Sequence, residues 1–244
     1  MKIFAVGDLH LSKSGEKPMD IFGAAWHNHA ERICENWKER VTDDDIVLVP
    51  GDLSWAMRLE EAYFDLHDIM CLPGKKVFVR GNHDYWWSSI SKVRNAFSEF
   101  PNTYFLQNDS VLIDGIAFAG TRGWLCPQSS EYKKQKDEPI YSREILRLEM
   151  SLNTLPLGCP RILLMHFPPM ADKNCPTGFT DLIEKHGVNN VVYGHLHGAS
   201  AALGFNGDLR NVRYTLCSAD HIGFSPVEVN LSDTRGVDDA YSEE

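Results

Sequence analysis

Residues 2–10 have the sequence KIFAVGDLH, and the same arrangement recurs at 45–52 (DIVLVPGD) and 76–84 (KVFVRGNHD). In each stretch an apolar, largely β-branched run is followed at once by carboxylate, imidazole or amide side chains. Two later stretches, RILLMH at 161–166 and NVVYGHLH at 190–197, repeat this order. Short apolar runs of this kind predict buried strands. Because ligand sites in open α/β sheets form beyond the C-terminal ends of the strands, the five motifs predict a single site assembled by the fold.

Helical patterns separate these strands. Residues 22–40 repeat apolar side chains at helical spacing, and further helices are expected at 58–71, 88–99, 142–154 and 179–186. Strands are expected at 2–6, 45–49, 76–80, 161–165, 190–193, 212–217 and 226–230. Alternation of strand and helix predicts a parallel sheet with right-handed crossovers.

The middle of the chain has a different character. Residues 111–119 alternate around Asp114-Gly115, a dipeptide typical of a tight hairpin turn. Residues 121–140 are expected to form a long polar loop, and loops of this length are usually functional or disordered. We therefore expect one α/β domain over residues 1–236, with helices flanking a two-layered sheet sandwich, and an acidic disordered tail over residues 237–244.

Charge and composition exclude some classes of function. The formal net charge of −10 argues against broad adhesion to nucleic acid, which needs a basic surface. No stretch approaches the roughly 18 apolar residues that a membrane span requires. The six cysteines form no C-x-x-C pair and the N-terminus does not resemble a signal peptide, so we expect reduced thiols and a cytoplasmic protein. The oligomeric state is left open.

The motifs contain a set of side chains suited to metal binding. Asp8-x-His10 and His195-x-His197 are each expected to project both ligands to one side of an extended backbone. Oxygen and nitrogen ligands without thiolate favour Mn, Fe or Zn over Ca. Because only two carboxylates are present, two divalent ions would leave a local charge of about +2, which suits a phosphate substrate. The candidate ligands are Asp8, His10, Asp52, Asn82, His166, His195 and His197.

The order DLH, GD, GNHD, H and GHLH over residues 8–197 resembles the calcineurin-like metallophosphoesterase superfamily. The resemblance implies a four-layer α/β/β/α sandwich with a dinuclear metal site at the C-terminal ends of the strands. It also implies that Asp52 bridges the two ions. One ion would be held by Asp8, His10, Asp52 and His197, and the other by Asp52, Asn82, His166 and His195.

This resemblance suggests a reaction. A hydroxide bridging two metal ions can attack phosphorus in line. By resemblance His83 would act as the acid at the leaving oxygen, and the adjacent Asp84 would orient that imidazole and raise its pKa. We therefore expect a hydrolase for a small phosphodiester or phosphomonoester, with nucleotides among the candidates.

Two alternatives are kept. One is a pyrophosphatase acting on a nucleotide-linked substrate, and the other is a non-catalytic scaffold of the same fold. Retention of His83 and of every ligand argues against the scaffold. The sequence after Asp52 is LSWA, which lacks the Gly-Asp-x-x-Asp-Arg-Gly extension of Ser/Thr protein phosphatases and argues against that role.

Three residues are candidates for contacts with the substrate. Trp86 follows the catalytic motif and is a candidate for stacking on a substrate, although aromatic residues opening a helix usually pack into the core. Arg122 and Trp124 are candidates for clamping a second phosphate or a base. The basic run at 133–136 is interpreted as a solvated surface rather than a lid.

Overall fold

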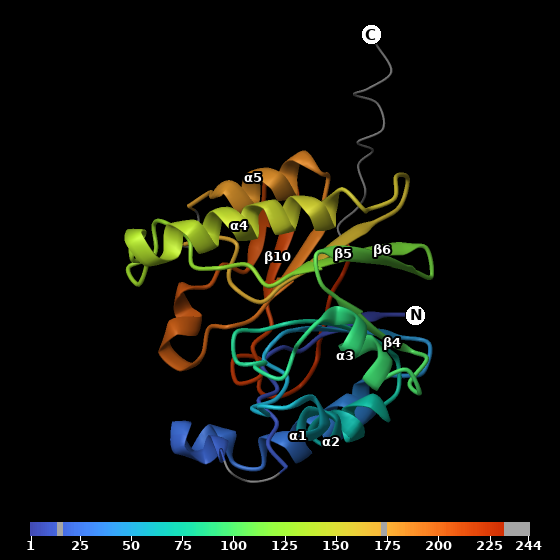
Figure 1. Cartoon of the computed structure of the whole chain (residues 1–244). Helices are drawn as coiled ribbons and strands as arrows, with labels where there is room; N and C mark the ends of the chain where they lie inside the picture. The colour runs from blue at the N-terminus through green and yellow to red at the C-terminus, as the bar shows by residue number, and fades with distance from the viewer. Residues whose placement is uncertain (14–16, 172–174, 232–244) are drawn as a thin grey trace.

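The computed structural model describes residues 1–13, 17–171 and 175–231, so the tail predicted for residues 237–244 lies outside the described residues. Two sheets face each other, and helices cover their outer sides (Figure 1). The first sheet is formed by strands from the N-terminal half of the chain together with one short strand near the C-terminus, and the second by strands between residues 109 and 216. None of the described helices is both long and apolar enough to cross a membrane.

The first sheet has the strand order β11-β1-β2-β3-β4. Its strands β1 to β4 run parallel, and the short β11 pairs antiparallel with β1. The strands are β1 (Ile3–Ala5), β2 (Ile46–Pro50), β3 (Lys75–Val79), β4 (Thr103–Leu106) and β11 (Val227–Glu228).

The second sheet has the order β5-β6-β7-β8-β10-β9. Strands β6, β7, β8 and β10 are parallel, whereas the outer strands β5 and β9 pair antiparallel with their neighbours. The strands are β5 (Asp109–Ile113), β6 (Ile116–Thr121), β7 (Arg161–Met165), β8 (Asn190–Tyr193), β9 (Gly207–Leu209) and β10 (Val212–Leu216).

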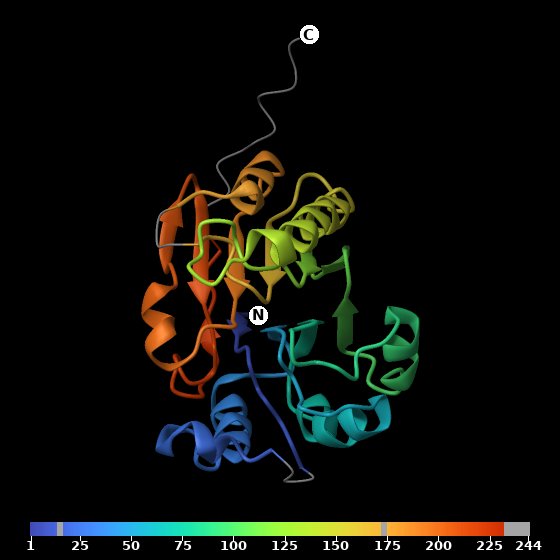
Figure 2. The ribbon, with the colours of Figure 1, turned by 60° about the vertical axis from the view of Figure 1, so that its left-hand side comes forward.

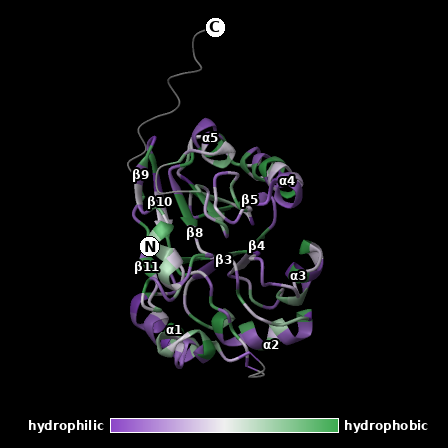
Figure 3. Cartoon of the chain, turned by 90° about the vertical axis from the view of Figure 1, so that its left-hand side faces the viewer, coloured by the Kyte–Doolittle hydropathy of each residue, from purple (hydrophilic) through white to green (hydrophobic). Residues whose placement is uncertain are grey.

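Three α-helices pack against the first sheet and two against the second (Figures 1 and 2). The first group is α1 (His29–Arg40), α2 (Leu59–Met70) and α3 (Ile90–Ala96). The second group is α4 (Lys134–Leu152) and α5 (Gly178–Lys185). Short 3₁₀ turns are formed by η1 (Met19–Phe22), η2 (Ala24–Trp26) and η3 (Gly198–Leu203). In Figure 3 the helices carry hydrophilic and hydrophobic patches side by side, as amphipathic helices do.

The central strands of both sheets are largely apolar because both of their faces are covered. In β2, Val47 and Val49 pack in the core beneath the helices of the first sheet, whereas Ile46 and Leu48 pack between the two sheets. Leu164 of β7 belongs to that same inter-sheet core. Continuous apolar runs are the expected sequence of strands buried on both faces. The predicted four-layer α/β/β/α arrangement is therefore confirmed.

Two predicted elements differ from the structure. The helix expected over 22–40 begins only at His29, because Asn28 has a left-handed backbone (φ 49°) and the preceding residues form 3₁₀ turns. The loop expected over 121–140 ends early, since α4 already begins at Lys134 and contains Pro139. The carboxylate of Asp137 in its first turn accepts the backbone N–H of Lys133 at 2.7 Å, which supports this early start. The short strands β4 and β9 are additions that the sequence patterns do not predict.

The hairpin at Asp114-Gly115 is confirmed. Strands β5 and β6 pair antiparallel on either side of this dipeptide. Both residues have positive φ, 50° and 80°, as a tight hairpin turn of the Asp-Gly type requires.

Candidate metal centre

Backbone hydrogen bonds lock the first two motif loops together. The N–H of Asp8 donates to the carbonyl of Gly51 at 3.0 Å, and the N–H of His10 donates to the carbonyl of Asp52 at 2.9 Å. These bonds continue the parallel pairing of β1 and β2 beyond the strands. The motifs are therefore brought side by side by the strand order of the first sheet.

The ligand-bearing loops are not extended. Asp8, His10, Asp52 and His195 have φ values of 57°, 45°, 52° and 74°. The expectation that Asp8-x-His10 and His195-x-His197 converge along an extended backbone is thus wrong: left-handed turns aim the side chains instead. Each such non-glycine residue costs on the order of 1–3 kcal/mol, and strain of this kind tends to cluster at functional sites.

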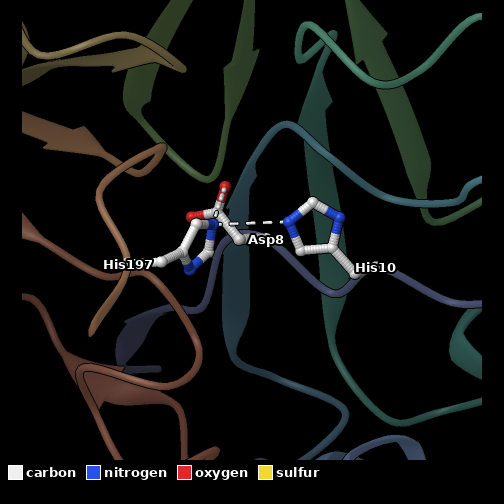
Figure 4. Close-up of side chains that lie close together, drawn as sticks. All are labelled: Asp8, His10 and His197. Carbon is white, nitrogen blue, oxygen red and sulfur yellow. Dashed lines mark hydrogen bonds and ion pairs between the residues drawn. The ribbon is translucent and has the colours of Figure 1, made fainter. Parts of the chain in front are cut away.

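One group of candidate ligands consists of Asp8, His10 and His197, whose side chains converge in Figure 4. The Nε2 atoms of His10 and His197 lie 3.3 Å apart. The Nε2 atom of His197 lies 3.7 Å from Oδ1 of Asp8. At this spacing, the two Nε2 atoms and the carboxylate oxygen are close enough to bind one metal ion.

A second group surrounds His166. Its Nε2 atom lies 2.7 Å from Oδ1 of Asn82, 3.3 Å from Nδ1 of His195 and 3.5 Å from Oδ2 of Asp52. The same Asp52 oxygen lies 3.8 Å from Nε2 of His10 in the first group. Asp52 thus stands between the two groups, where a bridging ligand must lie.

The donor and acceptor pattern around His166 fits a cation. Its Nδ1 atom lies 3.1 Å from the carbonyl oxygen of Pro50, which can only accept a hydrogen bond. A proton on Nδ1 leaves a lone pair on Nε2, directed at the amide oxygen of Asn82. Fixing the tautomer through the far nitrogen is typical of metal-binding histidines. A divalent ion satisfies lone pairs that face one another in this way.

The electrostatics of the site also fit cations. Asp8 and Asp52 are both buried. Burial and the neighbouring Asp8 raise the pKa of Asp52 to about 8. Burial lowers the pKa of His195 to about 3 and also lowers that of His10, so these two imidazoles are held in the neutral form that binds metals. His197 differs: despite its burial, hydrogen bonds to carboxylates raise its pKa to about 10, so an ion that binds this ring must displace a proton. The negative charge of two buried carboxylates is stabilised when positive ions bind between them.

Two motif glycines make room for the carboxylates. A Cβ atom at Gly81 would collide with the carboxylate of Asp52, and one at Gly194 would collide with the carboxylate of Asp8. The N–H of His195 donates to both oxygens of Asp8, at 3.1 and 3.0 Å. The backbone of the GHLH motif is thus packed directly against a ligand.

His83 lies beside this centre. Its backbone N–H donates to Oδ1 of Asp52 at 2.8 Å, and its ring centroid lies 5.8 Å from that of His10. The expected raised pKa of the His83 ring is contradicted: burial, with a further contribution from His166, lowers its pKa to about 4.

Asp84 has a different role from the one expected. Its Oδ1 atom accepts the backbone N–H of Leu53 at 2.8 Å and the indole N–H of Trp86 at 3.1 Å, and its Oδ2 atom accepts the N–H of Gly81 at 2.8 Å. Among the described residues, no hydrogen bond joins Asp84 to the His83 ring. Asp84 therefore ties the Gly51–Ser54 loop to the GNHD loop rather than orienting His83.

None of the three predicted substrate contacts lines the pocket that opens on His10 and His197. Trp86 is 2% exposed and packs in the helix-side core of the first sheet, which contradicts a stacking role. Arg122 forms an ion pair with Glu144 at 3.2 Å, and the indole of Trp124 donates to Asp137 at 3.1 Å. These partners hold both side chains against α4.

A pocket of about 350 Å³ opens on His10 and His197 instead. We call it the aromatic pocket, and it is lined by His10, Met19, Phe22, Trp26, Trp55, His83, His197, Gly198 and Asp220. The sequence interpretation missed Trp55, although it follows Gly51-Asp52 just as Trp86 follows the GNHD motif. The remaining wall residues come from η1, η2 and the segment after β10, for which no motif gave a signal.

Comparisons with known proteins agree with this fold. TT1561 of Thermus thermophilus superposes with a TM-score of 0.54 and 13% identity over 93% of this chain and 97% of its own. The protein of unknown function AQ665 from Aquifex aeolicus gives 0.50 and 14% over 93% and 95%. An archaeal phosphodiesterase gives 0.44 and 14% over 89% and 84%. No curated protein matches the chain.

The model of one family matches most of the sequence. It covers residues 1–199, which include every predicted metal ligand, and its description is calcineurin-like phosphoesterase. The match agrees with the resemblance drawn from the five motifs. The chain belongs to the calcineurin-like phosphoesterase family.

Proposed function

We propose that the chain is a binuclear metal-dependent hydrolase of small phosphodiesters or phosphomonoesters. The observation that carries this proposal is the aromatic pocket, which opens on the candidate ligands His10 and His197 and also contains His83. A phosphoester bound in this pocket would contact both the candidate metal centre and the side chain of His83, which can carry a proton. Family membership supports the same class of reaction.

The metal ligands fall into the two sets described above. Asp8, His10 and His197 would hold one ion, and Asn82, His166 and His195 the other, with Asp52 between them. Bound divalent ions acidify a water molecule and neutralise charge on phosphoryl oxygens. Whether the native ions are Mn, Fe or Zn stays a prediction.

His83 would serve the leaving oxygen. Its backbone is anchored by Asp52, and its ring packs against Trp55 with centroids 4.4 Å apart. A phosphate anion in the pocket adds negative charge beside this ring and so raises the pKa of His83, which favours proton donation. Asp84 would position His83 indirectly by fixing the loop that carries it.

The test is a substrate panel with added Mn²⁺, Fe²⁺ or Zn²⁺. It contains a generic diester, a generic monoester, several nucleotides and a nucleotide-linked pyrophosphate. We expect turnover with at least one ion. His83→Ala should keep its bound ions but lose about 10²- to 10⁴-fold in kcat, the usual contribution of an acid or base.

His67→Ala provides the matched control, because His67 is an exposed histidine on α2, away from the pocket lining. Its kcat should equal that of the unmodified protein. Tight metal binding without turnover of any phosphoester would contradict the proposal and favour the scaffold alternative. Unchanged kcat in His83→Ala would contradict only the proposed role of His83 and would leave the hydrolase proposal intact.

A further inference from the structure

Beside the candidate ligands, much of the lining of the aromatic pocket is apolar. Met19, Phe22, Trp26 and Trp55 supply this apolar surface. The one carboxylate in the lining, Asp220, is engaged by the ring of His197 at 2.8 Å. The space beside the metal centre therefore suits an uncharged group.

Trp55 links this apolar wall to the proposed chemistry. Its ring stacks on that of His10, with centroids 4.9 Å apart, and lies 4.4 Å from that of His83. The ammonium of Lys17 lies 4.8 Å from the same ring. These contacts hold Trp55 beside His83. A leaving group whose oxygen is next to His83 must therefore also be next to Trp55.

One further aromatic side chain at the pocket is free to bind a ligand. Phe22 is 63% exposed, and within the described part of the chain its ring contacts no other aromatic ring. Trp26, in contrast, is buried and packs edge-on against His197, with centroids 5.6 Å apart, so it forms part of the fixed wall. A large exposed ring at the rim of a pocket gains contact area when a ligand binds.

We propose that the aromatic pocket selects substrates whose leaving group carries a planar, uncharged aromatic ring packed against Trp55 and Phe22. This inference rests on the proposed hydrolase function and specifies its substrate class. The ring can be a simple aryl group or a nucleobase, since both offer the same flat apolar faces. The pocket volume of about 350 Å³ lies within the range of small-molecule sites.

The experiment compares methyl benzyl phosphate with methyl cyclohexylmethyl phosphate. Both substrates release a primary alcohol of similar size, and they differ in the aromaticity of its ring. We expect kcat/KM to favour the benzyl diester by about 3- to 10-fold, the range of aromatic pair contacts. Phe22→Leu and Trp55→Leu, which keep an apolar side chain, should each reduce this preference toward unity.

Ile21→Ala is the matched control. Ile21 is 74% exposed, is adjacent to Phe22 and is absent from the pocket lining. Its benzyl preference should equal that of the unmodified protein. Metal content is measured for Trp55→Leu, because Trp55 contacts His10. A second pair, a nucleoside 5′-methyl phosphate and its abasic ribose analogue, distinguishes a nucleobase from a simple aryl group.

Binding supplies a readout that is independent of turnover. Calorimetry with metal-loaded His83→Ala should give tighter binding of benzyl phosphate than of cyclohexylmethyl phosphate, and the difference should shrink when Phe22→Leu is added. Equal rates and equal affinities for the paired ligands would overturn the inference while leaving the hydrolase proposal intact. Failure to hydrolyse any phosphoester would overturn the hydrolase proposal, and the binding comparison would then decide whether the pocket prefers aromatic rings. A loss of preference in Ile21→Ala equal to that in Phe22→Leu would also overturn the inference.

Discussion

The carboxylate of Asp220 holds the ring of His197 from the side opposite the metal centre. Its Oδ1 atom lies 2.8 Å from Nδ1 of His197, and its Oδ2 atom accepts the backbone N–H of Gly198 at 2.8 Å. Nε2 of His197 is thereby directed toward Asp8 and His10. Asp220 follows β10 and His197 follows β8, so the parallel pairing of these two strands creates the contact.

Replacing Asp220 by Ala should lower metal affinity by about 10- to 100-fold, because carboxylates that orient ligating histidines contribute at that level. Asp220→Asn should lose less, since its amide oxygen can still accept from Nδ1. Affinity is measured by competition with a chromogenic chelator. Asp208→Ala, which removes an exposed carboxylate on β9, is the control. Equal affinities in all three variants would contradict the positioning role.

Asp84→Ala should destabilise the fold. The substitution removes the acceptor of the Leu53, Ser54 and Gly81 backbone N–H groups in a fully buried place. An unsatisfied buried donor costs about 1–3 kcal/mol, so the free energy of unfolding should fall by at least that amount. Urea denaturation measures the change.

Asp84→Asn should lose less free energy of unfolding than Asp84→Ala, because it keeps an acceptor oxygen at the same place. Asp208→Ala is the surface control. It removes an exposed ion pair with Arg213, and such pairs contribute about 0–1 kcal/mol. A loss no larger than that of Asp208→Ala would show that the loop does not depend on Asp84.

Binding of divalent ions should stabilise the folded protein. An ion at 100 times its dissociation constant adds about 2.7 kcal/mol to the free energy of unfolding, provided that the unfolded chain does not bind it. Added Mn²⁺ or Zn²⁺ should therefore raise Tm relative to chelator-treated protein, as measured by scanning calorimetry. Asp52→Asn should reduce this rise because it removes the candidate bridging ligand.

In chelator, without bound ions, we expect the Tm difference between Asp52→Asn and the unmodified protein to have the opposite sign or to vanish. Burial and the neighbouring Asp8 raise the pKa of Asp52 above its unfolded value, so this carboxyl group destabilises the fold at neutral pH when no ion is bound. Asp52→Asn removes that cost, so its Tm in chelator should equal or exceed that of the unmodified protein. A Tm rise on ion addition that is the same in both proteins would exclude Asp52 as a ligand.

Lys76 should make the free energy of unfolding depend on pH in the alkaline range. Its buried ammonium donates to the carbonyl of Gly74 at 2.9 Å and to that of Leu72, and burial lowers its pKa from 10.5 to about 8. The unfolded chain thus binds more protons than the folded one between about pH 8 and 10.5. The free energy of unfolding contributed by this group must rise with pH across that window.

Lys76→Met should lack this rise, so the unmodified protein should gain stability relative to the variant from pH 8 to pH 10. Urea unfolding at several pH values measures the difference. Lys75→Met is the neighbouring control: its ion pair with Asp114 raises the pKa of Lys75, so it should show no comparable change below pH 10.5. A constant difference between the Lys76→Met variant and the unmodified protein would contradict the lowered pKa.

The strands, and the proximity of the candidate ligands, were predictable from the sequence because their signals are local. β7 and β8 match the predicted bounds, since strands buried on both faces leave uninterrupted apolar runs. Each run ends at a side chain of metal-binding type, and parallel strands deliver their C-terminal ends to one edge. The residue types and the parallel strand order were therefore enough to predict that the candidate ligands lie close together, although the conformation of the loops was not predicted.

Tertiary structure alone decided how those ligands are aimed and what surrounds them. Left-handed backbone at Asp8 replaced the expected extended geometry, because hydrogen bonds to the neighbouring loop hold it there. The Asp84 carboxylate accepts backbone N–H groups instead of contacting the ring of His83, and only the folded loops bring those N–H groups close to it. Trp26 and Asp220 entered the site from segments nearly 200 residues apart in the sequence. Asp220 belongs to no motif, and the helical spacing that includes Trp26 predicts only a packed helix face. Side-chain contacts between distant loops depend on packing and not on local sequence.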